Sequence, residues 1–252
     1  MRRSIKNLIA SAAMLAAIPA FAAEFRVITT GAPKHVVDAV AAKFLADTGH
    51  KAIFIQDTAG GVRRRVEAGE AAEIIVATPD VLNALMASGK VVQGSRVDFA
   101  STGVGVGIKE GLPKPDISTV DAIKKLVADA PSIALPDPKA GGTSAVYIEG
   151  MFKKLGLSDV VNAKAKLKAG GYAADLVASG EAIIVFHQMS EIKPVKGVTL
   201  IGPLPAEIQL VTVYSAALSS GLVSDPAKAF MTSLAGPTGR EATEKAGMDA
   251  VK

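Results

Sequence analysis

Cysteine and tryptophan are both absent from the 252-residue chain. Without cysteine there can be no disulfide, no thiol nucleophile, no thiolate metal ligand and no lipid attached to a cysteine. The chain has 3 histidines, and their scattered positions at His35, His50 and His187 do not suggest a zinc centre. We therefore expect neither a bound metal nor a cofactor.

Aromatic residues are also scarce: they make up 4% of the chain and include only 3 tyrosines, which leaves little surface for stacking nucleic acid bases. Basic residues exceed acidic ones by 28 to 24. However, Arg2, Arg3 and Lys6 lie in the first 22 residues, which contain no acid, so the rest of the chain has 25 basic residues against 24 acidic ones. This near-neutral balance gives no reason to expect nucleic acid as a partner.

The first 22 residues have the pattern of an export signal. A basic start is followed by the apolar run from Leu8 to Pro19 and by Ala20-Phe21-Ala22, a small-x-small cleavage site. The pattern predicts cleavage near Ala22 and a mature protein free in a bacterial periplasm. No later segment is long and apolar enough to cross a membrane, and no surplus amphipathic segment indicates self-association, so a monomer is expected.

Short apolar runs alternate along the mature chain with segments whose apolar residues recur every three or four positions. This alternation predicts an α/β protein in which mainly parallel sheets are flanked by helices. A Pro/Gly-rich connection from Lys109 to Ser118 separates two such series, and a long strand from Gln209 to Ala217 leads back to the first. We therefore expect one lobe from residues 23–100 plus 210–252, and a second from residues 101–209.

Glycine-rich polar loops occur where predicted strands end and helices begin, near Gly31, Gly60-Gly61, Gly141-Gly142 and Gly170-Gly171. In open α/β sheets ligands bind beyond the carboxyl ends of strands, so such loops from two lobes would meet around one small ligand. After Gly142, either Thr143 or Ser144 can cap the next helix. The free N–H groups at a helix start bind anions without needing a formal positive charge.

Three motifs in this order resemble the periplasmic molybdate-binding protein family. They are Phe25-Arg-Val-Ile-Thr-Thr-Gly-Ala32, Arg64-Arg-Val-Glu-Ala-Gly69 followed by Ile74-Ile-Val-Ala-Thr-Pro-Asp80, and Asp137-Pro-Lys-Ala-Gly-Gly-Thr-Ser144. The resemblance covers nearly the whole mature chain. It implies a two-lobed, type II periplasmic binding fold that closes on an anion in the cleft between its lobes and delivers it to the membrane permease of an ABC importer.

The loops and the resemblance together predict a set of ligand-binding residues at strand ends and helix starts: Thr30, Gly31, Ala32, Thr58, Ala59, Gly60, Gly142, Thr143, Ser144, Tyr172, His187 and Gln188. The sequence departs from the family pattern in two places. Members of the family present serine hydroxyls at the first two loops, where this chain has Ala32 and Ala59 or Gly60. Where they have a tyrosine at the end of a strand in the second lobe, this chain has Phe186-His187-Gln188. These departures make an organic anion an alternative to molybdate.

Three consecutive arginines, Arg63 to Arg65, follow the second loop. Arg63 is the best placed to grip a carboxylate with two parallel hydrogen bonds; the alternative is that the three form a solvated basic face. His187 also has two interpretations. It is either a donor or base in the cleft, or a histidine at the edge of the core that hydrogen-bonds a backbone carbonyl.

An enzymatic function remains open beside transport, because aconitate isomerase resembles a member of the same fold family. Interconversion of cis- and trans-aconitate is an allylic proton shift, which needs groups that clamp carboxylates and one base within reach of the carbon. Arg63 and Arg64 would clamp the substrate, and His187 or Asp57 would be the base. The sequence leaves both functions standing.

Overall fold

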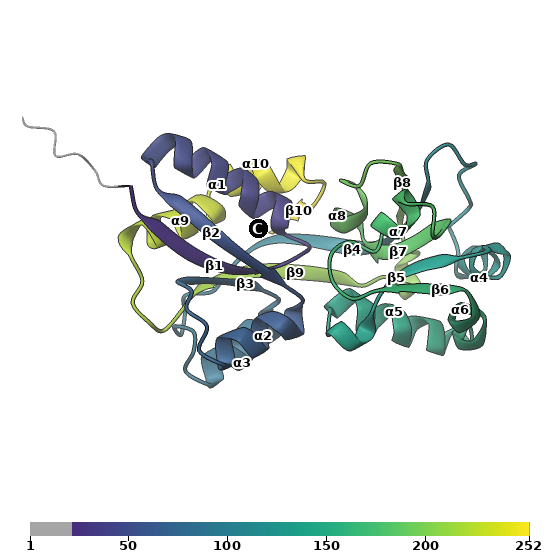
Figure 1. The fold of residues 1–252 in the computed structure, drawn as a ribbon, viewed down its shortest axis with the longest axis horizontal. Helices are drawn as coiled ribbons and strands as arrows, with labels where there is room; N and C mark the ends of the chain where they lie inside the picture. The colour runs from purple at the N-terminus through teal and green to yellow at the C-terminus, as the bar shows by residue number, and fades with distance from the viewer. Residues whose placement is uncertain (1–21, 252) are drawn as a thin grey trace, which may run out of the picture.

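The computed structural model describes residues 22–251, so the predicted export signal lies almost wholly outside the described residues. Two lobes stand side by side, and the long strands β4 (Val97–Lys109) and β9 (Val211–Leu218) run between them (Figure 1). The predicted two-lobed α/β fold is confirmed.

The first lobe contains β1 (Glu24–Thr30), α1 (Lys34–Thr48), β2 (Lys51–Asp57), α2 (Ala59–Glu67), β3 (Ile74–Ala77), α3 (Pro79–Ala87), α9 (Asp225–Ala235), α10 (Pro237–Lys245) and β10 (Asp249–Ala250). The second contains α4 (Val120–Asp129), β5 (Ile133–Pro136), the 3₁₀ turn η1 (Pro138–Ala140), α5 (Thr143–Lys154), α6 (Ser158–Lys164), β6 (Ala165–Lys168), α7 (Asp175–Ala178), β7 (Ile184–Gln188), α8 (Met189–Ile192), β8 (Val198–Pro203) and η2 (Ala206–Ile208). The sequence patterns did not reveal α6, α8, α10 or β10, which are short or follow directly on a neighbouring element.

The strands follow the order β2-β1-β3-β9-β4-β7-β5-β6, with β8 and β10 also paired to β4. Pairs within β2-β1-β3 and β7-β5-β6 are parallel, as expected. The pairs made by β4 and β9 are antiparallel, so the sheets are mixed rather than mainly parallel. Strands that pass from lobe to lobe run against their neighbours, which the local sequence pattern cannot reveal.

The strand β4 changes partners along its length. Residues 97–103 pair with β9, whereas residues 104–109 pair with β7 and β8. The side chain of Gln209 marks the same point, because its amide bonds the backbone of Val104 on both the N–H and the carbonyl side. The predicted lobe boundaries at residues 100 and 210 lie close to this change of partner and stay a prediction.

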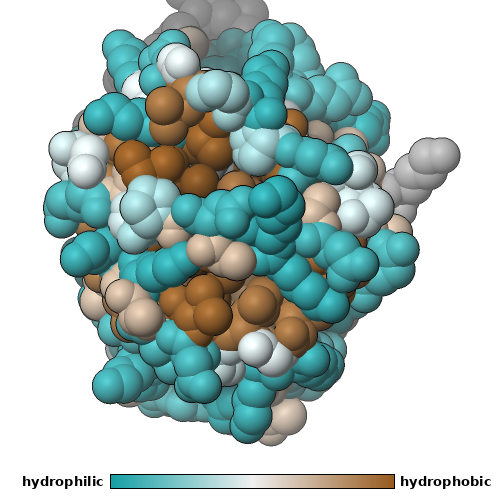
Figure 2. All heavy atoms as spheres, turned by 90° about the vertical axis from the view of Figure 1, so that its right-hand side faces the viewer, coloured by the Kyte–Doolittle hydropathy of each residue, from teal (hydrophilic) through white to brown (hydrophobic). Residues whose placement is uncertain are grey.

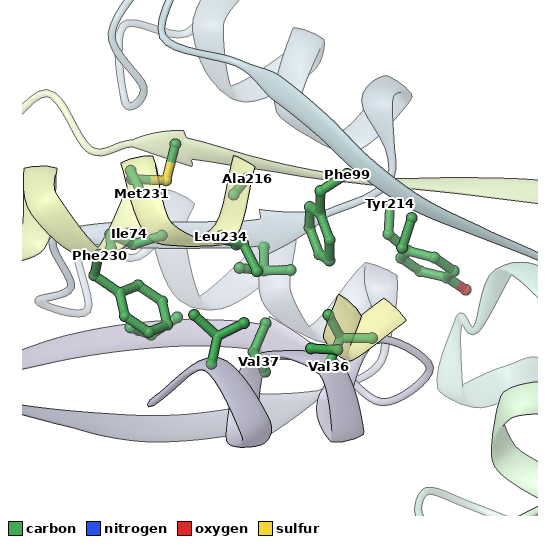
Figure 3. Packing of buried hydrophobic residues seen from close by; sticks show 14 of the residues in the cluster. Val36, Val37, Ile74, Phe99, Tyr214, Ala216, Phe230, Met231 and Leu234 are labelled. Atoms are coloured by element: carbon green, nitrogen blue, oxygen red, sulfur yellow. The ribbon is translucent and has the colours of Figure 1, made fainter. Parts of the chain in front are cut away.

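Each sheet is covered by helices on both faces. In the first lobe α1, α9 and α10 pack on one face, and α2 and α3 on the other. Figure 3 shows the first of these cores, where Val36 and Val37 of α1 meet Phe230 and Leu234 of α9. Tyr214 of β9 lies at the edge of this cluster with its hydroxyl pointing away from the other labelled side chains. In the second lobe α4, α5 and α6 cover one face, and α7 and α8 the other.

Two glycines in β4 explain how α8 reaches the sheet. A Cβ added to Gly105 would lie 2.6 Å from the side chain of Met189, and one added to Gly107 would lie 2.7 Å from the side chain of Ile192. Because β4 has no side chains at these positions, α8 lies directly on the strand. The Gly-rich stretch thus fixes the height of α8 above β4.

The end of the second lobe shows apolar side chains in hollows that are separated by a polar band (Figure 2). A groove of about 620 Å³ on this lobe is lined by residues of β5, α5, α6 and β6. No helix among the described residues is long and apolar enough to cross a membrane. Within the same range, no group of three or more His, Asp or Glu side chains is placed to hold a metal ion.

Candidate functional site

A cavity of about 410 Å³ lies between the lobes. It is lined by Thr30, Gly31, Ala32, Gln56, Asp57, Thr58, Ala59, Pro136, Asp137, Ala140, Gly142, Thr143, Ser144, Ala145, Lys168, Gly170, Gly171, His187, Glu191 and Tyr214. These residues come from strand ends and the loops that follow them, which is where an α/β sheet places its ligands. The loops near Gly31, Gly60-Gly61, Gly141-Gly142 and Gly170-Gly171 that the sequence analysis singled out all contribute to the cavity or flank it.

Three helix N-termini meet at this cavity. Residues of the loop before α1, the first residues of α2 and the first residues of α5 all line it. Each helix start carries N–H groups without an intrahelical partner and the positive end of the helix dipole. Such a meeting of three helix starts favours a negatively charged ligand.

The helix α5 leaves its first donors unused. Gly142, with extended backbone, is the N-cap residue, and no side chain caps the helix. The prediction that Thr143 or Ser144 would be the cap is therefore wrong, because both already belong to the first helical turn. Within the described residues the N–H groups of Thr143, Ser144 and Ala145 bond to no acceptor, so a ligand in the cavity can receive them.

The hydroxyl groups on the first-lobe side differ in availability. The Thr58 hydroxyl accepts from the N–H of Gly61 at 3.1 Å and donates to the carbonyl of Ala140 at 2.6 Å, so it is already engaged. The Thr30 hydroxyl is buried and has no partner within the described residues. Thr30 is therefore the first-lobe hydroxyl that remains for a ligand.

Contacts between the lobes flank the cavity on two sides. On one side the Thr58 hydroxyl reaches Ala140, and the N–H of Gly60 donates to the carbonyl of Gly141 at 3.0 Å. On the other side the Tyr172 hydroxyl lies 3.3 Å from Nε2 of His35. With both contacts formed, the lobes are closed around the cavity.

The ionic groups at the cavity are largely paired. The carboxylate of Asp57 receives Nε of Arg65 at 2.6 Å and the N–H of Thr58 at 2.8 Å. The ammonium group of Lys168 lies 3.1 Å from a carboxylate oxygen of Asp175. Lys168 is the cation that lines the cavity, and the remaining attraction for an anion comes from N–H and hydroxyl donors.

Glu191 and His187 form a buried pair at the base of the cavity, with Glu191 Oε2 3.2 Å from His187 Nε2. Only 8% of Glu191 and 3% of His187 are exposed. Burial raises the pKa of Glu191 to about 8 and lowers the pKa of His187 to about 3. Both shifts favour the uncharged forms, so near pH 7 the pair is a carboxylic acid beside a neutral imidazole.

Two tyrosines stand close enough to Glu191 to be affected by its charge. Burial, followed by the carboxyl group of Glu191, raises the pKa of both Tyr172 and Tyr214 above the usual value. Tyr214 lines the cavity from β9, and Tyr172 comes from the loop before α7. Both phenols therefore stay protonated and act as neutral donors or acceptors.

The structure brings most of the predicted site residues together. Thr30, Gly31, Ala32, Asp57, Thr58, Ala59, Gly142, Thr143, Ser144 and His187 all line the cavity. Gly60 and Tyr172 lie at its rim, in the contacts between lobes. Gln188 does not line the cavity: it is the last residue of β7 and is buried, and its amide donates to the Thr212 hydroxyl at 3.1 Å.

The three consecutive arginines, Arg63 to Arg65, do not line the cavity. Arg63 is exposed and its Nε donates to Glu67 at 2.7 Å, one turn further along α2. Arg64 is exposed too, with its guanidinium near the backbone of Gly60 and Gly141. Neither lines the cavity. Arg65, which the sequence analysis did not single out, is the arginine that reaches a cavity residue, Asp57.

Sequence reasoning missed several residues that line the cavity: Gln56, Pro136, Asp137, Ala140, Ala145, Lys168, Glu191 and Tyr214. Glu191 is chemically the most important of these. Its signal was a single carboxyl group in the otherwise apolar or neutral stretch from Ile183 to Ile192, four residues after His187. A buried charge-bearing residue of this kind marks a functional site more often than an exposed one does.

A two-lobed α/β protein with an anion-favouring cavity between its lobes is by its architecture a ligand-binding protein. The chain matches the model of the bacterial extracellular solute-binding protein family over residues 25–249, and it belongs to that family. It is 31% identical to an aconitate isomerase from a Pseudomonas species over 258 aligned positions, which cover 98% of this chain and 97% of the relative.

Solved structures share the fold at low sequence identity. The periplasmic molybdate-binding protein of Azotobacter vinelandii is 20% identical, with a TM-score of 0.75, and the match covers 90% of this chain and 100% of that one. The sulfate-binding protein SubI of Mycobacterium tuberculosis is 17% identical, with a TM-score of 0.70, covering 91% and 88% of the two chains. The predicted family resemblance is confirmed, and at these identities the structures establish the fold.

Proposed function

We propose that the protein is a periplasmic receptor that captures a small organic carboxylate between its lobes and passes it, as a monomer, to the permease of an ABC importer. The observation that carries the proposal is the meeting of three helix N-termini at the cavity between the lobes, with unused N–H donors on α5. Membership of a solute-binding family supports a transport role.

The size of the cavity favours an organic anion over a four-oxygen oxyanion. Its volume is about 410 Å³. A tetrahedral oxyanion fills only a few times the ~30 Å³ that a water molecule takes up in the liquid. Pockets of ~300–1,000 Å³ are typical for larger organic ligands. A ligand with several carboxylate groups would fill more of this volume while accepting from the donors of more than one helix start.

A thermal-shift screen of residues 23–252 against citrate, cis-aconitate, trans-aconitate, molybdate, tungstate and sulfate tests the proposal. A ligand that binds only the folded state must raise the unfolding midpoint. We expect the carboxylates to raise it and the metal oxyanions to have little effect, with titration calorimetry giving the dissociation constants. If none of the carboxylates in the panel binds by either method, the proposal is wrong.

A second function, isomerisation of aconitate in the same cavity, is favoured by one specific observation. The buried Glu191–His187 pair offers an acid and a base beside one another at the cavity, and the relative at 31% identity is an aconitate isomerase. In an allylic shift the base removes a proton from the methylene carbon, the double bond moves, and a proton is returned to the former vinyl carbon. No oxidant or reductant is needed.

Proton NMR of cis-aconitate incubated with the protein tests this second function. Growth of trans-aconitate signals to an equilibrium mixture, and their absence with His187→Ala, would support it. Saturable binding without any conversion over a day would leave the receptor as the function. This assay also decides between the two roles that the sequence left open for His187.

A further inference from the structure

Glu191 is buried without a cation to balance it. The helix that carries it, α8, packs on β4, β7 and β8. Where it meets β4, the strand contributes Gly105 and Gly107, and β8 contributes no titratable side chain. The groups that face Glu191 or share the cavity with it are His187, Tyr172, Tyr214, Asp57 held by Arg65, Asp137, and Lys168 held by Asp175. None of them places an unpaired positive charge against the Glu191 carboxyl group.

The two oxygens of Glu191 face in different directions. Oε2 lies 3.2 Å from His187 Nε2, and His187 Nδ1 has no partner within the described residues. A neutral imidazole has one N–H, so placing it on Nε2 makes that nitrogen the donor to Oε2. Oε1 points to the first lobe, where it lies 2.6 Å from the position that a Cβ on Gly31 would occupy. The proton of the acid then belongs on Oε1, at the loop before α1.

We infer that Glu191 is a ligand-recognising acid, which donates its proton from Oε1 in a hydrogen bond to an anionic oxygen of the carboxylate ligand. This inference rests on the proposed function and assigns to the same cavity a residue that sets its specificity. No bond to carbon forms or breaks, and the proton stays between two oxygens. The ionised form of Glu191 would repel the ligand, so binding requires the acid form.

The position of Glu191 supports this role in a second way. It belongs to the second lobe, yet Oε1 reaches the Gly31 loop of the first lobe, so a ligand oxygen bonded to it lies at the junction of the lobes. Because Gly31 has no side chain, the Glu191 carboxyl group can approach the loop, with Nε2 of Gln56 3.2 Å from the same Cβ position. The same acid would thus contribute to ligand selection and to closure.

Titration calorimetry with trans-aconitate between pH 6.5 and 9.5 tests the inference. Ordinary carboxylic acids are ionised throughout this range, so the charge of the ligand stays constant and only groups of the protein change protonation. With wild-type protein the affinity should be constant near pH 7 and fall about tenfold per pH unit above pH 8, as one proton must be bound with the ligand. Glu191→Gln keeps a neutral donor and should make the affinity independent of pH within about twofold. Glu149→Gln, the same change on the exposed face of α5, should behave as wild type.

Proton uptake gives a measurement that needs no variant. At pH 9, titrations in two buffers of different ionisation enthalpy should show nearly one proton taken up per ligand bound by the wild type. Binding that is independent of pH, or that takes up no proton, overturns the role of Glu191 while the receptor function survives. A pH dependence retained in Glu191→Gln also overturns it. If trans-aconitate and citrate both fail to bind at any pH, the proposed function fails and the inference with it.

Discussion

Two carboxyl groups, Asp57 and Glu191, line the same cavity from opposite lobes, but only the first is paired with a cation. The carboxylate of Asp57 accepts hydrogen bonds from Nε of Arg65 and from the N–H of Thr58. Glu191 is buried beside a neutral histidine, and burial raises its pKa to about 8. Position in the cavity therefore does not decide the charge of an acid; the nearest cation and the access of water do. A site for anions can keep both groups because one is compensated and the other is uncharged.

The largest effect should come from filling the space beneath the helix that carries Glu191. In Gly107→Ala the new Cβ would lie 2.7 Å from Ile192, 2.9 Å from Val185 and 3.1 Å from Val198. Because all three side chains are packed, α8 must move, at a cost of about 3 kcal/mol, the upper end of the usual range for overpacking. Urea unfolding followed by circular dichroism measures the loss, and calorimetry should show weakened ligand binding.

The matched control for this substitution is Gly150→Ala. Gly150 lies in α5, and an added Cβ would meet nothing within 4 Å. Here alanine should stabilise the protein by about 0.5–1 kcal/mol, through its higher helix propensity. Equal stability changes for the two variants would show that β4 and α8 are not in close contact.

The uncharged state of Glu191 predicts how stability depends on pH. Between pH 6.5 and 8 the folded protein keeps Glu191 mostly protonated, whereas in the unfolded chain its pKa returns to the ordinary value of 4.5 and the group is ionised. Folding therefore binds a proton, and the free energy of unfolding falls as the pH rises, by at most about 1.4 kcal/mol per pH unit. In Glu191→Gln this fall should disappear, as urea unfolding at pH 6.5, 7.25 and 8 would reveal.

His187 gives the opposite slope at lower pH. Its pKa is lowered to about 3, so between pH 3 and 6.5 the unfolded chain binds a proton that the folded protein does not, and stability rises with pH. From pH 4.5 to 6.5 the two slopes oppose one another, and only above pH 6.5 does Glu191 act alone. A wild-type stability that rises between pH 6.5 and 8 would contradict the assignment of a neutral Glu191.

The contrast between the two acids also explains what the sequence could and could not predict. Strand and helix periodicity is local, so the α/β alternation and the glycine-rich loops around the cavity could be predicted from it. Asp57 stands next to one of those loops and was named as a candidate. Glu191 follows a strand on a helix of only four residues, too short for a periodic pattern, and its approach to Gly31 depends on closure of the lobes. The partner of Asp57 was missed for a similar reason: three adjacent arginines look equivalent until the helix is placed.

The ion pair between Arg65 and Asp57 can be tested by removing the positive charge of Arg65. In Arg65→Met the Asp57 carboxylate loses its cation, and affinity for trans-aconitate should fall about tenfold as like charges face one another. Adding Asp57→Asn to Arg65→Met should restore most of the affinity, because the uncompensated charge is then gone. Titration calorimetry of the wild type, both single variants and the double variant measures the coupling.

The neighbouring arginine provides the comparison. Arg63 pairs with Glu67 on the outer face of α2, so Arg63→Met should change the affinity by no more than about twofold. A tenfold loss in Arg63→Met, with none in Arg65→Met, would reverse the roles that the geometry gives them. Arg63 would then be the carboxylate-gripping residue that the sequence pattern suggested.

The smallest effect concerns the contact that closes the cavity on the side of Glu191. Tyr172→Phe removes the hydroxyl that lies 3.3 Å from His35, and a partly exposed hydrogen bond of this kind contributes about 0.5–1 kcal/mol. Since the contact forms only when the lobes meet, its loss should weaken ligand binding about threefold and leave urea unfolding of the ligand-free protein nearly unchanged. Tyr147→Phe is the matched control, because its hydroxyl donates to Ile208 within one lobe at 2.9 Å. Tyr147→Phe should lower the stability and leave the affinity unchanged. If Tyr172→Phe instead lowers the stability of the ligand-free protein and leaves the affinity unchanged, then Tyr172 supports only the second lobe. The contacts made by Thr58 and Gly60 would then be the ones that form on closure.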